Sequence, residues 1–340
     1  QIGNDINGET GKGEDSGSSV SIDAHGDRVA IGDENNDGTG TDAGHVRAFE
    51  LNSSNNWVQM GADIDGEAAG DKFGVAVSMS YDGKRLAVGA EENDGVASNA
   101  GHARVFEYSN SSWTQLGSDI EPDIDLGSAD DEFGKVVSIS GDYAVVGARF
   151  DDDAGDASGS AYVFIRSGTS WSQQAKLTAS DAAANDRFGS TVQISGDYAV
   201  VGTRYDNDAG VASGSAYIFI RSGTSWSQQA KLTAGDAAAG DWFGHVSISG
   251  DYVVAGAYGD DDLGSKSGSA YTFVRSGTSW SQQAKITAGR AIEDSHFGVS
   301  VSLDYDGDIV AIGAPDLNNG VVGVYKFGTD GSWAQLGSDI

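Results

Sequence analysis

The chain has 340 residues, 39% of them hydrophobic, so it is long enough to bury a large core. Its 51 acidic and 20 basic residues give a formal net charge of −31, which argues against nucleic acid and anionic membranes as partners. The absence of cysteine excludes disulfides and cysteine-ligated zinc, and no apolar run reaches the roughly 18 residues needed for membrane insertion.

Along the chain the sequence repeats itself about every 55 residues. A Phe-Gly pair opens five of six units, and Ser16-Gly17 replaces it in the first unit. A tryptophan recurs late in every unit, at Trp57, Trp113, Trp171, Trp226, Trp280 and Trp333. We expect a single domain over 1–340, with units at about 16–72, 73–132, 133–187, 188–242, 243–296 and 297–340, while 1–15 overlaps the closing segment.

Within a unit the pattern predicts four short strands. In the third unit these are FGKVVSIS, DYAVVGA, SAYVFIRS and SWSQQAKLTA. Gly-Asp or Asp-Gly pairs between the first two strands indicate tight hairpins. Several strands are apolar on both faces, which favours sheets stacked around a ring. The sequence therefore predicts an all-β, six-bladed β-propeller of four-stranded antiparallel blades, with a stacked β-solenoid as the alternative.

One unit is a residue shorter than its neighbours. Phe243 lies seven residues before Gly250, whereas Phe133 and Phe188 lie eight before their glycines. A deletion inside a strand would reverse its faces, so we expect the loss to be absorbed next to Gly244.

Phe-Gly followed by Val-Gly-Ala resembles the FG-GAP repeat of integrin alpha-chain propellers and related surface proteins. The matching residues are Phe73-Gly74 with Val88-Gly89-Ala90, Phe133-Gly134 with Val146-Gly147-Ala148, and Phe297-Gly298 with Ile312-Gly313-Ala314. The resemblance implies an extracellular, often adhesive binding module, with calcium in some hairpins between first and second strands. Only Asp304, Asp306 and Asp308 keep such a motif, and a plain Asp-Gly hairpin explains them equally well.

Acidic residues also fill the loops between second and third strands. In a propeller these loops emerge on the same face as the loops between blades, which are acidic too, for example Asp181 with Asp186 and Asp236 with Asp241. Close carboxylates favour hard cations, calcium first, and the alternative is a set of solvated turns. The metal candidates in these loops are Asp33, Asp37, Asp151, Asp153, Asp206, Asp208, Asp260 and Asp262.

The other candidate residues do not form a catalytic motif. His45 and His102 occupy equivalent repeat positions, which favours a packing role over catalysis. The acids belong to the repeat instead of departing from it, so we expect no enzyme. Trp242 has no counterpart in other units and is the best aromatic contact to a ligand, while Asn52 and Asn110 begin glycosylation sequons.

The two ends of the chain are copies of one repeat segment, QIGNDI at residues 1–6 and QLGSDI at residues 335–340. One copy is surplus, so a terminal strand is expected to pair with another copy of the chain. Together these patterns predict a secreted, non-enzymatic adhesion or recognition module, linked to calcium, with a protein or glycan ligand at the acidic face. The alternatives are a structural subunit of an extracellular filament or coat, and a polysaccharide-binding lectin.

Overall fold

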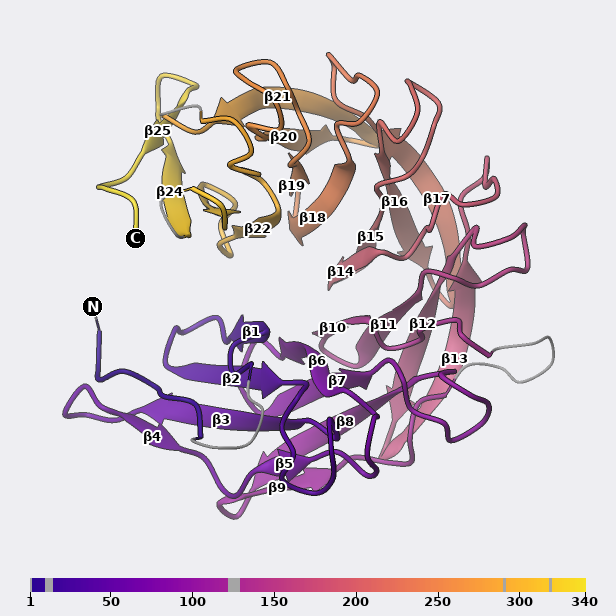
Figure 1. The fold of residues 1–340 in the computed structure, drawn as a ribbon, viewed down its shortest axis with the longest axis vertical. Coiled ribbons are helices and arrows are strands. Elements are labelled where there is room, and N and C mark those ends of the chain that lie inside the picture. The colour runs from indigo at the N-terminus through magenta and orange to yellow at the C-terminus, as the bar shows by residue number, and fades with distance from the viewer. Residues whose placement is uncertain (1, 10–14, 122–128, 290–291, 318–319) are drawn as a thin grey trace. The chain divides into compact units, whose positions relative to one another are not determined.

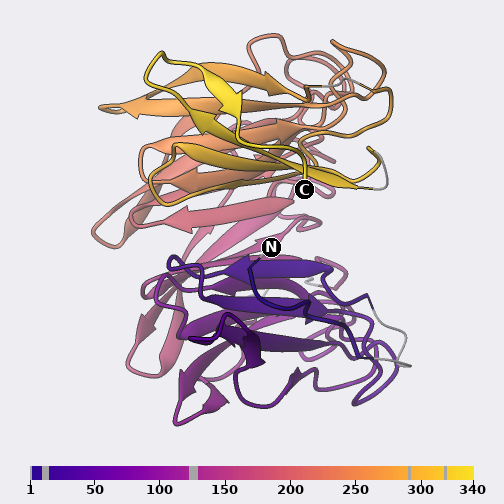
Figure 2. The ribbon, with the colours of Figure 1, turned by 90° about the vertical axis from the view of Figure 1, so that its left-hand side faces the viewer.

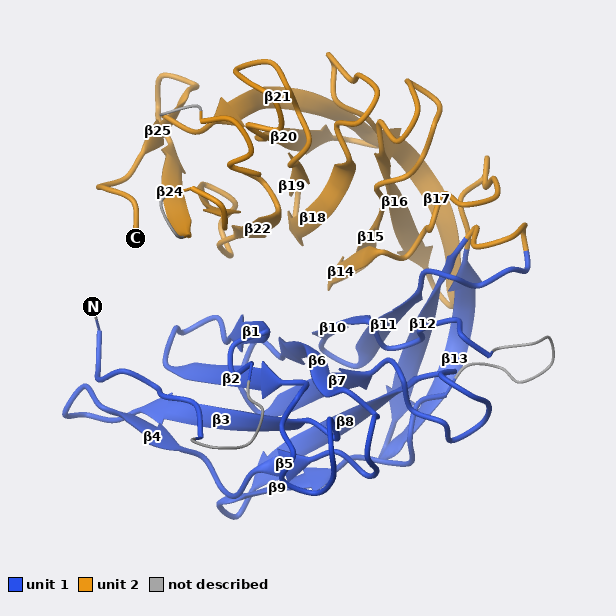
Figure 3. Cartoon of the chain, in the orientation of Figure 1, with its two compact units in different colours: residues 1–153, 159–177 blue, residues 154–158, 178–340 orange. Residues whose placement is uncertain are grey.

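The computed structural model describes residues 2–9, 15–121, 129–289, 292–317 and 320–340. Within these residues the regular structure is entirely β, and no helix could span a membrane. The chain forms two compact units, residues 1–153 with 159–177 and residues 154–158 with 178–340 (Figure 3). Each unit holds three antiparallel sheets, whose strands lie side by side in Figures 1 and 2.

Unit 1 contains blades 1 to 3. Their strands are β1 Ser19–Ile22, β2 Arg28–Asp33, β3 His45–Leu51 and β4 Trp57–Gln59; β6 Phe73–Met79, β7 Arg85–Ala90, β8 His102–Ser109 and β9 Ser112–Gln115; and β10 Val136–Ser140, β11 Tyr143–Ala148, β12 Ser160–Ser167 and β13 Ser170–Leu177. The short strand β5 Ile64–Asp65 pairs with β3 as a fifth member of the first sheet. Each sheet otherwise follows chain order, as consecutive hairpins require.

Unit 2 contains blades 4 to 6. Their strands are β14 Thr191–Ser195, β15 Tyr198–Thr203, β16 Ser215–Ser222 and β17 Ser225–Leu232; β18 Phe243–Ser249, β19 Tyr252–Ala257, β20 Ser269–Ser276 and β21 Ser279–Thr287; and β22 Ser300–Leu303, β23 Ile309–Ala314, β24 Val321–Phe327 and β25 Trp333–Gln335. The predicted fold, a six-bladed β-propeller of four-stranded antiparallel blades, is confirmed. The expectation of one domain over 1–340 stays a prediction.

Local chemistry explains why each blade forms. Gly141 has a φ of 60° at the first position of a two-residue turn, as a type II′ hairpin requires. The second and third strands are buried along most of their length, for example β11 and β12. The outer strands are more exposed, which explains their Ser and Gln content.

The Phe-Gly pair joins neighbouring blades. Phe243 is fully buried, and its ring meets Tyr271 and Phe273 of blade 5 at 5.8 and 6.0 Å between centroids. It also forms a parallel bridge to Gly214 of blade 4, where a Cβ would lie 2.0 Å from the carbonyl oxygen of Phe243. The motif therefore supplies both the buried ring and the close backbone contact between blades.

Candidate functional site

A lysine lies among the loop aspartates in each of blades 3, 4 and 5. The lysines are Lys176, Lys231 and Lys285, and each stands opposite a tyrosine on the neighbouring strand, Tyr162, Tyr217 or Tyr271. Each hairpin contains a β-bulge that sets this register. The loop aspartates therefore meet an ammonium group of their own blade.

Blade 4 gives the full geometry of this Asp–Tyr–Lys cluster. Lys231 Nζ lies 2.8 Å from Asp181, 2.8 Å from Asp206 and 2.7 Å from Asp208. The Tyr217 hydroxyl lies 2.9 Å from Asp206 Oδ2 and 2.8 Å from Asp181 Oδ1. The other oxygen of Asp206 accepts the backbone N–H of Asp208 at 2.9 Å, which closes the loop around the cluster.

Blade 5 repeats this geometry and blade 3 varies it. Lys285 Nζ lies 2.8 Å from Asp236, 2.8 Å from Asp260 and 2.6 Å from Asp262. In blade 3, Lys176 contacts Asp151 and Asp153, and the Tyr162 hydroxyl donates to Asp151 at 2.7 Å. The counterpart of Asp181 and Asp236 in blade 3 is residue 126, a leucine that lies outside the described residues.

These contacts favour the charged forms of the lysine and its carboxylates. Burial alone lowers the pKa of Lys231, but hydrogen bonds to Asp181, Asp206 and Asp208 outweigh it and raise the pKa. Burial alone raises the pKa of Asp151, yet hydrogen bonds from Lys176 and Tyr162 hold it below its ordinary value. Each ammonium therefore supplies the positive charge that the repeated aspartates need.

Metal binding at these clusters would require a rearrangement. In blades 4 and 5 the three carboxylates offer oxygen atoms within 4.8 Å of one another, which confirms that the acids converge. Calcium takes six to eight oxygen ligands, and the lysine ammonium already contacts all three carboxylates. The residues fit a calcium ion only with the lysine turned out, so metal at Asp151, Asp153, Asp206, Asp208, Asp260 and Asp262 stays a prediction.

A further buried aspartate lies next to each cluster, two residues before Phe-Gly. Burial, followed by repulsion from Asp151, raises the pKa of Asp131 to about 7. Burial raises the pKa of Asp241 to about 6, and Asp260 adds to the effect although the Ala238 N–H opposes it. These carboxyls are ready to take up a proton near neutral pH.

In blades 1, 2 and 6 other residues occupy the positions of the Asp–Tyr–Lys cluster. Asn93 stands where blade 4 has Asp206, and its amide donates to Asp71 at 3.0 Å. Arg104 stands where blade 4 has Tyr217, and it pairs with Glu67 at 3.4 Å. In blade 6, Leu317 and Gly323 take these places and line a cavity of about 230 Å³. The Asp–Tyr–Lys combination thus changes as a set from blade to blade.

Asp33 and Asp37 have separate roles in blade 1. Buried Asp33 accepts the backbone N–H of Asp15 at 3.0 Å. Exposed Asp37 accepts the N–H of Asp42 at 2.8 Å and so closes its own loop. The structure gives these two carboxylates different partners, and metal binding by them stays a prediction.

Each of blades 1 and 2 brings one histidine near two carboxylates, Glu9 and Asp63 around His45 and Glu67 and Asp119 around His102. Burial, followed by the charge of Arg104, lowers the pKa of His102 to about 4, so this imidazole is neutral. Arg104 also pairs with Glu67, which offsets the negative charge without a metal ion. Both histidines are buried, and the packing role expected for them stays a prediction.

In the blade 6 hairpin, Asp304 closes the turn. Its Oδ1 accepts the N–H groups of Asp308 and Ile309, both at 3.0 Å. Asp308 lies 3.3 Å from Lys326, and Asp306 is exposed. These contacts are those of a plain Asp-Gly hairpin, and calcium at Asp304, Asp306 and Asp308 stays a prediction.

The residue before Phe-Gly has the same backbone geometry in every unit where the pair occurs, although its identity differs. These residues are Lys72, Glu132, Arg187, Trp242 and His296, with φ between 51° and 57°. A left-handed backbone conformation is unfavourable for residues other than glycine. In Lys72, Arg187, Trp242 and His296 it is held by a backbone hydrogen bond from the residue's own N–H to the preceding blade, which for Trp242 runs to Ala212 at 3.1 Å. Five blades therefore carry a variable side chain on the same backbone conformation.

Trp242 takes this position in blade 5 and is half-buried. Its ring packs on Tyr258 with 5.0 Å between centroids, and Lys266 Nζ lies 5.2 Å from the indole centre. The glycosylation candidates Asn52 and Asn110 are exposed, and Asn52 Oδ1 accepts N–H groups of Ser54 and Asn56. Contact of Trp242 with a ligand and glycosylation of the asparagines stay predictions.

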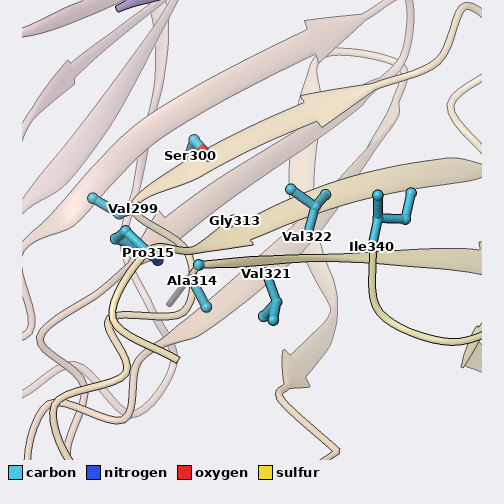
Figure 4. Close-up of a pocket in the computed structure, with 9 residues that line it drawn as sticks. Val299, Ser300, Gly313, Ala314, Pro315, Val321, Val322 and Ile340 are labelled. Carbon is cyan, nitrogen blue, oxygen red and sulfur yellow. The ribbon is translucent and has the colours of Figure 1, made fainter. Parts of the chain in front are cut away.

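A shallow pocket of about 280 Å³ lies on blade 6, where Val299, Val321 and Val322 gather with Ile340 around Gly313 (Figure 4). In blade 5 the carbonyl of Gly298 covers the corresponding Gly256, whereas the atoms nearest to a Cβ at Gly313 belong to Ser300. The pocket side chains are apolar apart from Ser300. This pocket is a sheet face and has no evident catalytic group.

The sequence interpretation missed the three lysines, although the sequence contains their signal. Lys176, Lys231 and Lys285 recur at one position of the fourth strand. Those three blades also carry Asp-x-Asp in the loop and tyrosine at the third residue of the third strand, where the other three blades have Arg47, Arg104 and Gly323 and no Asp-x-Asp in the loop. The joint appearance of the three features indicates that they interact.

Comparisons with known proteins support the fold. A model described as "FG-GAP repeat" matches residues 64–106, 125–164, 171–219, 226–273 and 280–325, more than half of the chain. A search of curated proteins found no match. Two solved structures show a similar fold. One is a Lactobacillus plantarum protein with TM-score 0.59 and 15% identity, over 92% of this chain and 82% of that chain. The other is the Pseudomonas aeruginosa periplasmic gluconolactonase PpgL, with TM-score 0.58 and 14% identity, over 95% of this chain and 85% of that chain.

The second likeness corrects the expectation that the chain is not an enzyme. That expectation rested on acids belonging to the repeat and on missing catalytic motifs, but a gluconolactonase is built on a similar fold. A repeated propeller is therefore no argument against catalysis. At 14% identity the likeness shows the fold alone, and it assigns no reaction to this chain.

Proposed function

The chain belongs to the FG-GAP repeat family, and from this premise we propose that it is an extracellular adhesion or recognition module. Its ligand, a protein or a glycan, contacts the face that carries the loops between second and third strands and the loops between blades. The surface charge fits such a role, because −31 opposes nonspecific contact with nucleic acids and anionic membranes.

One observation carries this proposal. Blades 3 to 5 are near copies, yet the residue before Phe-Gly changes from Glu132 to Arg187 to Trp242 while its φ stays between 52° and 57°. A fixed backbone with one changing side chain is how a scaffold presents recognition residues. A purely structural position in near-identical repeats would keep its residue, as the buried Phe of Phe-Gly does.

The calcium-linked form of this function depends on the acidic clusters. A cation at Asp181, Asp206 and Asp208 must replace Lys231, so we expect affinity for calcium to be low while the lysine is present. Thermal unfolding in EDTA and in added calcium, with magnesium as control, tests this point. A ligand that binds only the folded state, at a free concentration 100 times its Kd, adds about 2.7 kcal/mol to the free energy of unfolding. A calcium-specific rise in Tm supports calcium-linked recognition, and an unchanged Tm assigns the cation role to lysine.

Adhesion itself is tested with the chain coupled to beads. The beads are offered extracellular polysaccharides and matrix proteins, and bound ligand is quantified before and after incubation to detect turnover. We expect capture that Trp242→Ala weakens and that Tyr305→Ala, which removes an exposed hairpin aromatic, leaves unchanged. Capture insensitive to Trp242→Ala, or none from the panel, would contradict recognition at this face. Pairing between copies of the chain, and the filament or coat role, stay predictions.

A further inference from the structure

Unit 2 carries aromatic and basic side chains that contact one another in sequence across blades 4 and 5. We call this set the aromatic–basic strip; it consists of Arg187, Arg204, Tyr205, Trp242, Tyr258 and Lys266.

Blade 3 shows what the strip replaces. There Arg149 follows the second strand and donates from Nε to Glu132, the residue before Phe-Gly, at 2.7 Å. In blade 4 the same two positions hold Arg204 and Arg187. Two arginines thus occupy the positions that the Arg149–Glu132 ion pair occupies in blade 3.

Both guanidinium groups lie against one tyrosine ring. The Cζ atoms of Arg187 and Arg204 are 4.6 and 5.1 Å from the Tyr205 ring centre. Within the described residues Arg204 forms no ion pair with a carboxylate; its side chain hydrogen-bonds to Tyr258, and its Nε is buried without a hydrogen-bond partner. A guanidinium so placed is preorganised for an anion that the chain itself does not supply.

The aromatic surface continues into blade 5. Tyr258 packs on Trp242 at 5.0 Å and meets His245 edge-on at 5.2 Å. Burial, followed by the charge of Arg204, lowers the pKa of His245 to about 4, so the strip's positive charge comes from Arg187, Arg204 and Lys266. Flat rings beside fixed cations suit a ring-shaped ligand that carries a negative charge.

We propose that the aromatic–basic strip binds an anionic saccharide, with sugar rings against Trp242 and Tyr258 and the acidic group on Arg204 and Arg187. This rests on the proposed recognition function and names the class of ligand. The acidic group is a carboxylate or a sulfate ester, since both match the guanidinium fork. The other acidic side chains repel such a ligand at long range, but at 0.15 M salt the Debye length of about 8 Å confines that repulsion.

The test measures binding by calorimetry at 0.15 M salt, with oligogalacturonate, a sulfated galactan oligosaccharide, a neutral galactan oligosaccharide and poly-glutamate. The central variant is Arg187→Glu, which rebuilds the Glu132–Arg149 pair that blade 3 already contains and should therefore fold normally. Arg221→Ala is the control, because it removes an arginine from the outer hairpin of the same blade, where it pairs with Asp197. Melting curves verify that all variants are folded.

We expect at least one anionic saccharide to bind, with Kd about tenfold higher in Arg187→Glu and in Trp242→Ala and unchanged within twofold in Arg221→Ala. A preference for oligogalacturonate or for the sulfated galactan identifies the acidic group. If neutral galactan binds equally well and its binding depends on Trp242, the proposal that the ligand is anionic is wrong, while the proposed recognition function still holds. If poly-glutamate binds and the saccharides do not, the proposal of a saccharide ligand is wrong. If an anionic saccharide binds equally well to Arg187→Glu and to Trp242→Ala, the aromatic–basic strip is not its binding site. Binding of no ligand here, together with failed bead capture, removes the proposed function as well.

Discussion

Lys231 shows how a single residue decides the chemistry of an acidic loop. Asp181, Asp206 and Asp208 approach one another closely enough to share an ion, and the ammonium group lies within 2.8 Å of each. The repeated aspartates could be solvated, could bind a cation or could contact a partner. In the described clusters they are instead neutralised by a lysine of their own blade. The side chain of Asp206 is 4% exposed, which makes its pairing costly to lose.

Replacing Lys231 with methionine should therefore destabilise the fold and create a calcium response. Breaking a buried pair costs 3–5 kcal/mol, and the exposure of Asp181 and Asp208 reduces this to about 1–3 kcal/mol. Calcium should then raise the Tm of Lys231→Met more than it raises that of the unmodified chain, because the three carboxylates are left without their cation. Lys326→Met is the control, since its pair with Asp308 is exposed and should contribute less than about 1 kcal/mol. Equal calcium responses in all three proteins would contradict the role of the lysine.

Asp131 makes a pH-dependent contribution of the opposite kind. Its pKa is about 7 in the folded chain, above the ordinary value of 3.8, so the folded state holds an extra proton between these pH values. The free energy of unfolding therefore falls as pH rises through this window. Asp131→Asn removes the ionisable group and should stabilise the chain by about 2 kcal/mol at pH 8, with a smaller gain at pH 5.

Denaturant unfolding at the two pH values measures this difference. Asp71→Asn provides the matched comparison, because Asp71 occupies the same repeat position but accepts hydrogen bonds from Asn93 and Ala68. Its replacement should not stabilise the chain at pH 8. A stability gain for Asp131→Asn that is the same at pH 5 and pH 8 would show that the carboxyl is not the titrating group.

Contact between neighbouring blades depends on glycine. A Cβ on Gly256 would lie 1.9 Å from the carbonyl oxygen of Gly298, a backbone atom of the next blade. On Gly313 the nearest atom is Ser300 Oγ at 2.2 Å, which a side-chain rotation can move. Gly256→Ala should cost about 3 kcal/mol or prevent folding, whereas Gly313→Ala should cost about 1 kcal/mol.

Thermal unfolding of the two variants separates these costs. Adding Ser300→Ala to Gly313→Ala removes the obstacle and should restore most of the lost stability. Similar losses in Gly256→Ala and Gly313→Ala would mean that the backbone of the next blade does not approach as closely as the structure indicates.

Strands and hairpins were predictable from the sequence because their causes are local. Alternating apolar residues and Gly-Asp turns give the strand order. The missing residue of blade 5 is absorbed next to Gly244, because one residue interrupts the pairing between Phe243 and His245, whereas two interrupt it between Phe73 and Ala76 in blade 2. The Asp–Tyr–Lys clusters depend instead on register across a hairpin. Phe164 pairs with Gln173 but Val163 with Ala175, so Gln174 is the extra residue of the bulge. If the strands paired regularly, without the bulge, Gln174 would face Val163, and Ala175 would face Tyr162 in place of Lys176. Nothing in the periodicity of a single strand indicates such a bulge.

Charge acts on the whole molecule in two opposing ways. The formal net charge of −31 makes the molecule repel itself over long distances, and dissolved salt screens this repulsion. The Asp–Tyr–Lys clusters are attractive, but their contacts of 2.6–2.8 Å in blades 4 and 5 are shorter than any Debye length and partly shielded from water. Salt should therefore weaken the repulsion more than it weakens the clusters.

We accordingly expect the Tm to rise as sodium chloride increases from 0.01 to 0.15 M, where the Debye length shortens from about 30 to about 8 Å. A gain of about 1–2 kcal/mol corresponds to a rise of a few degrees in a chain of this size. Potassium chloride should act equally, because screening depends on ionic strength and not on the ion. A fall in Tm with salt would mean that the attractive clusters outweigh the overall repulsion, and Lys231→Met should then lose much of that salt dependence.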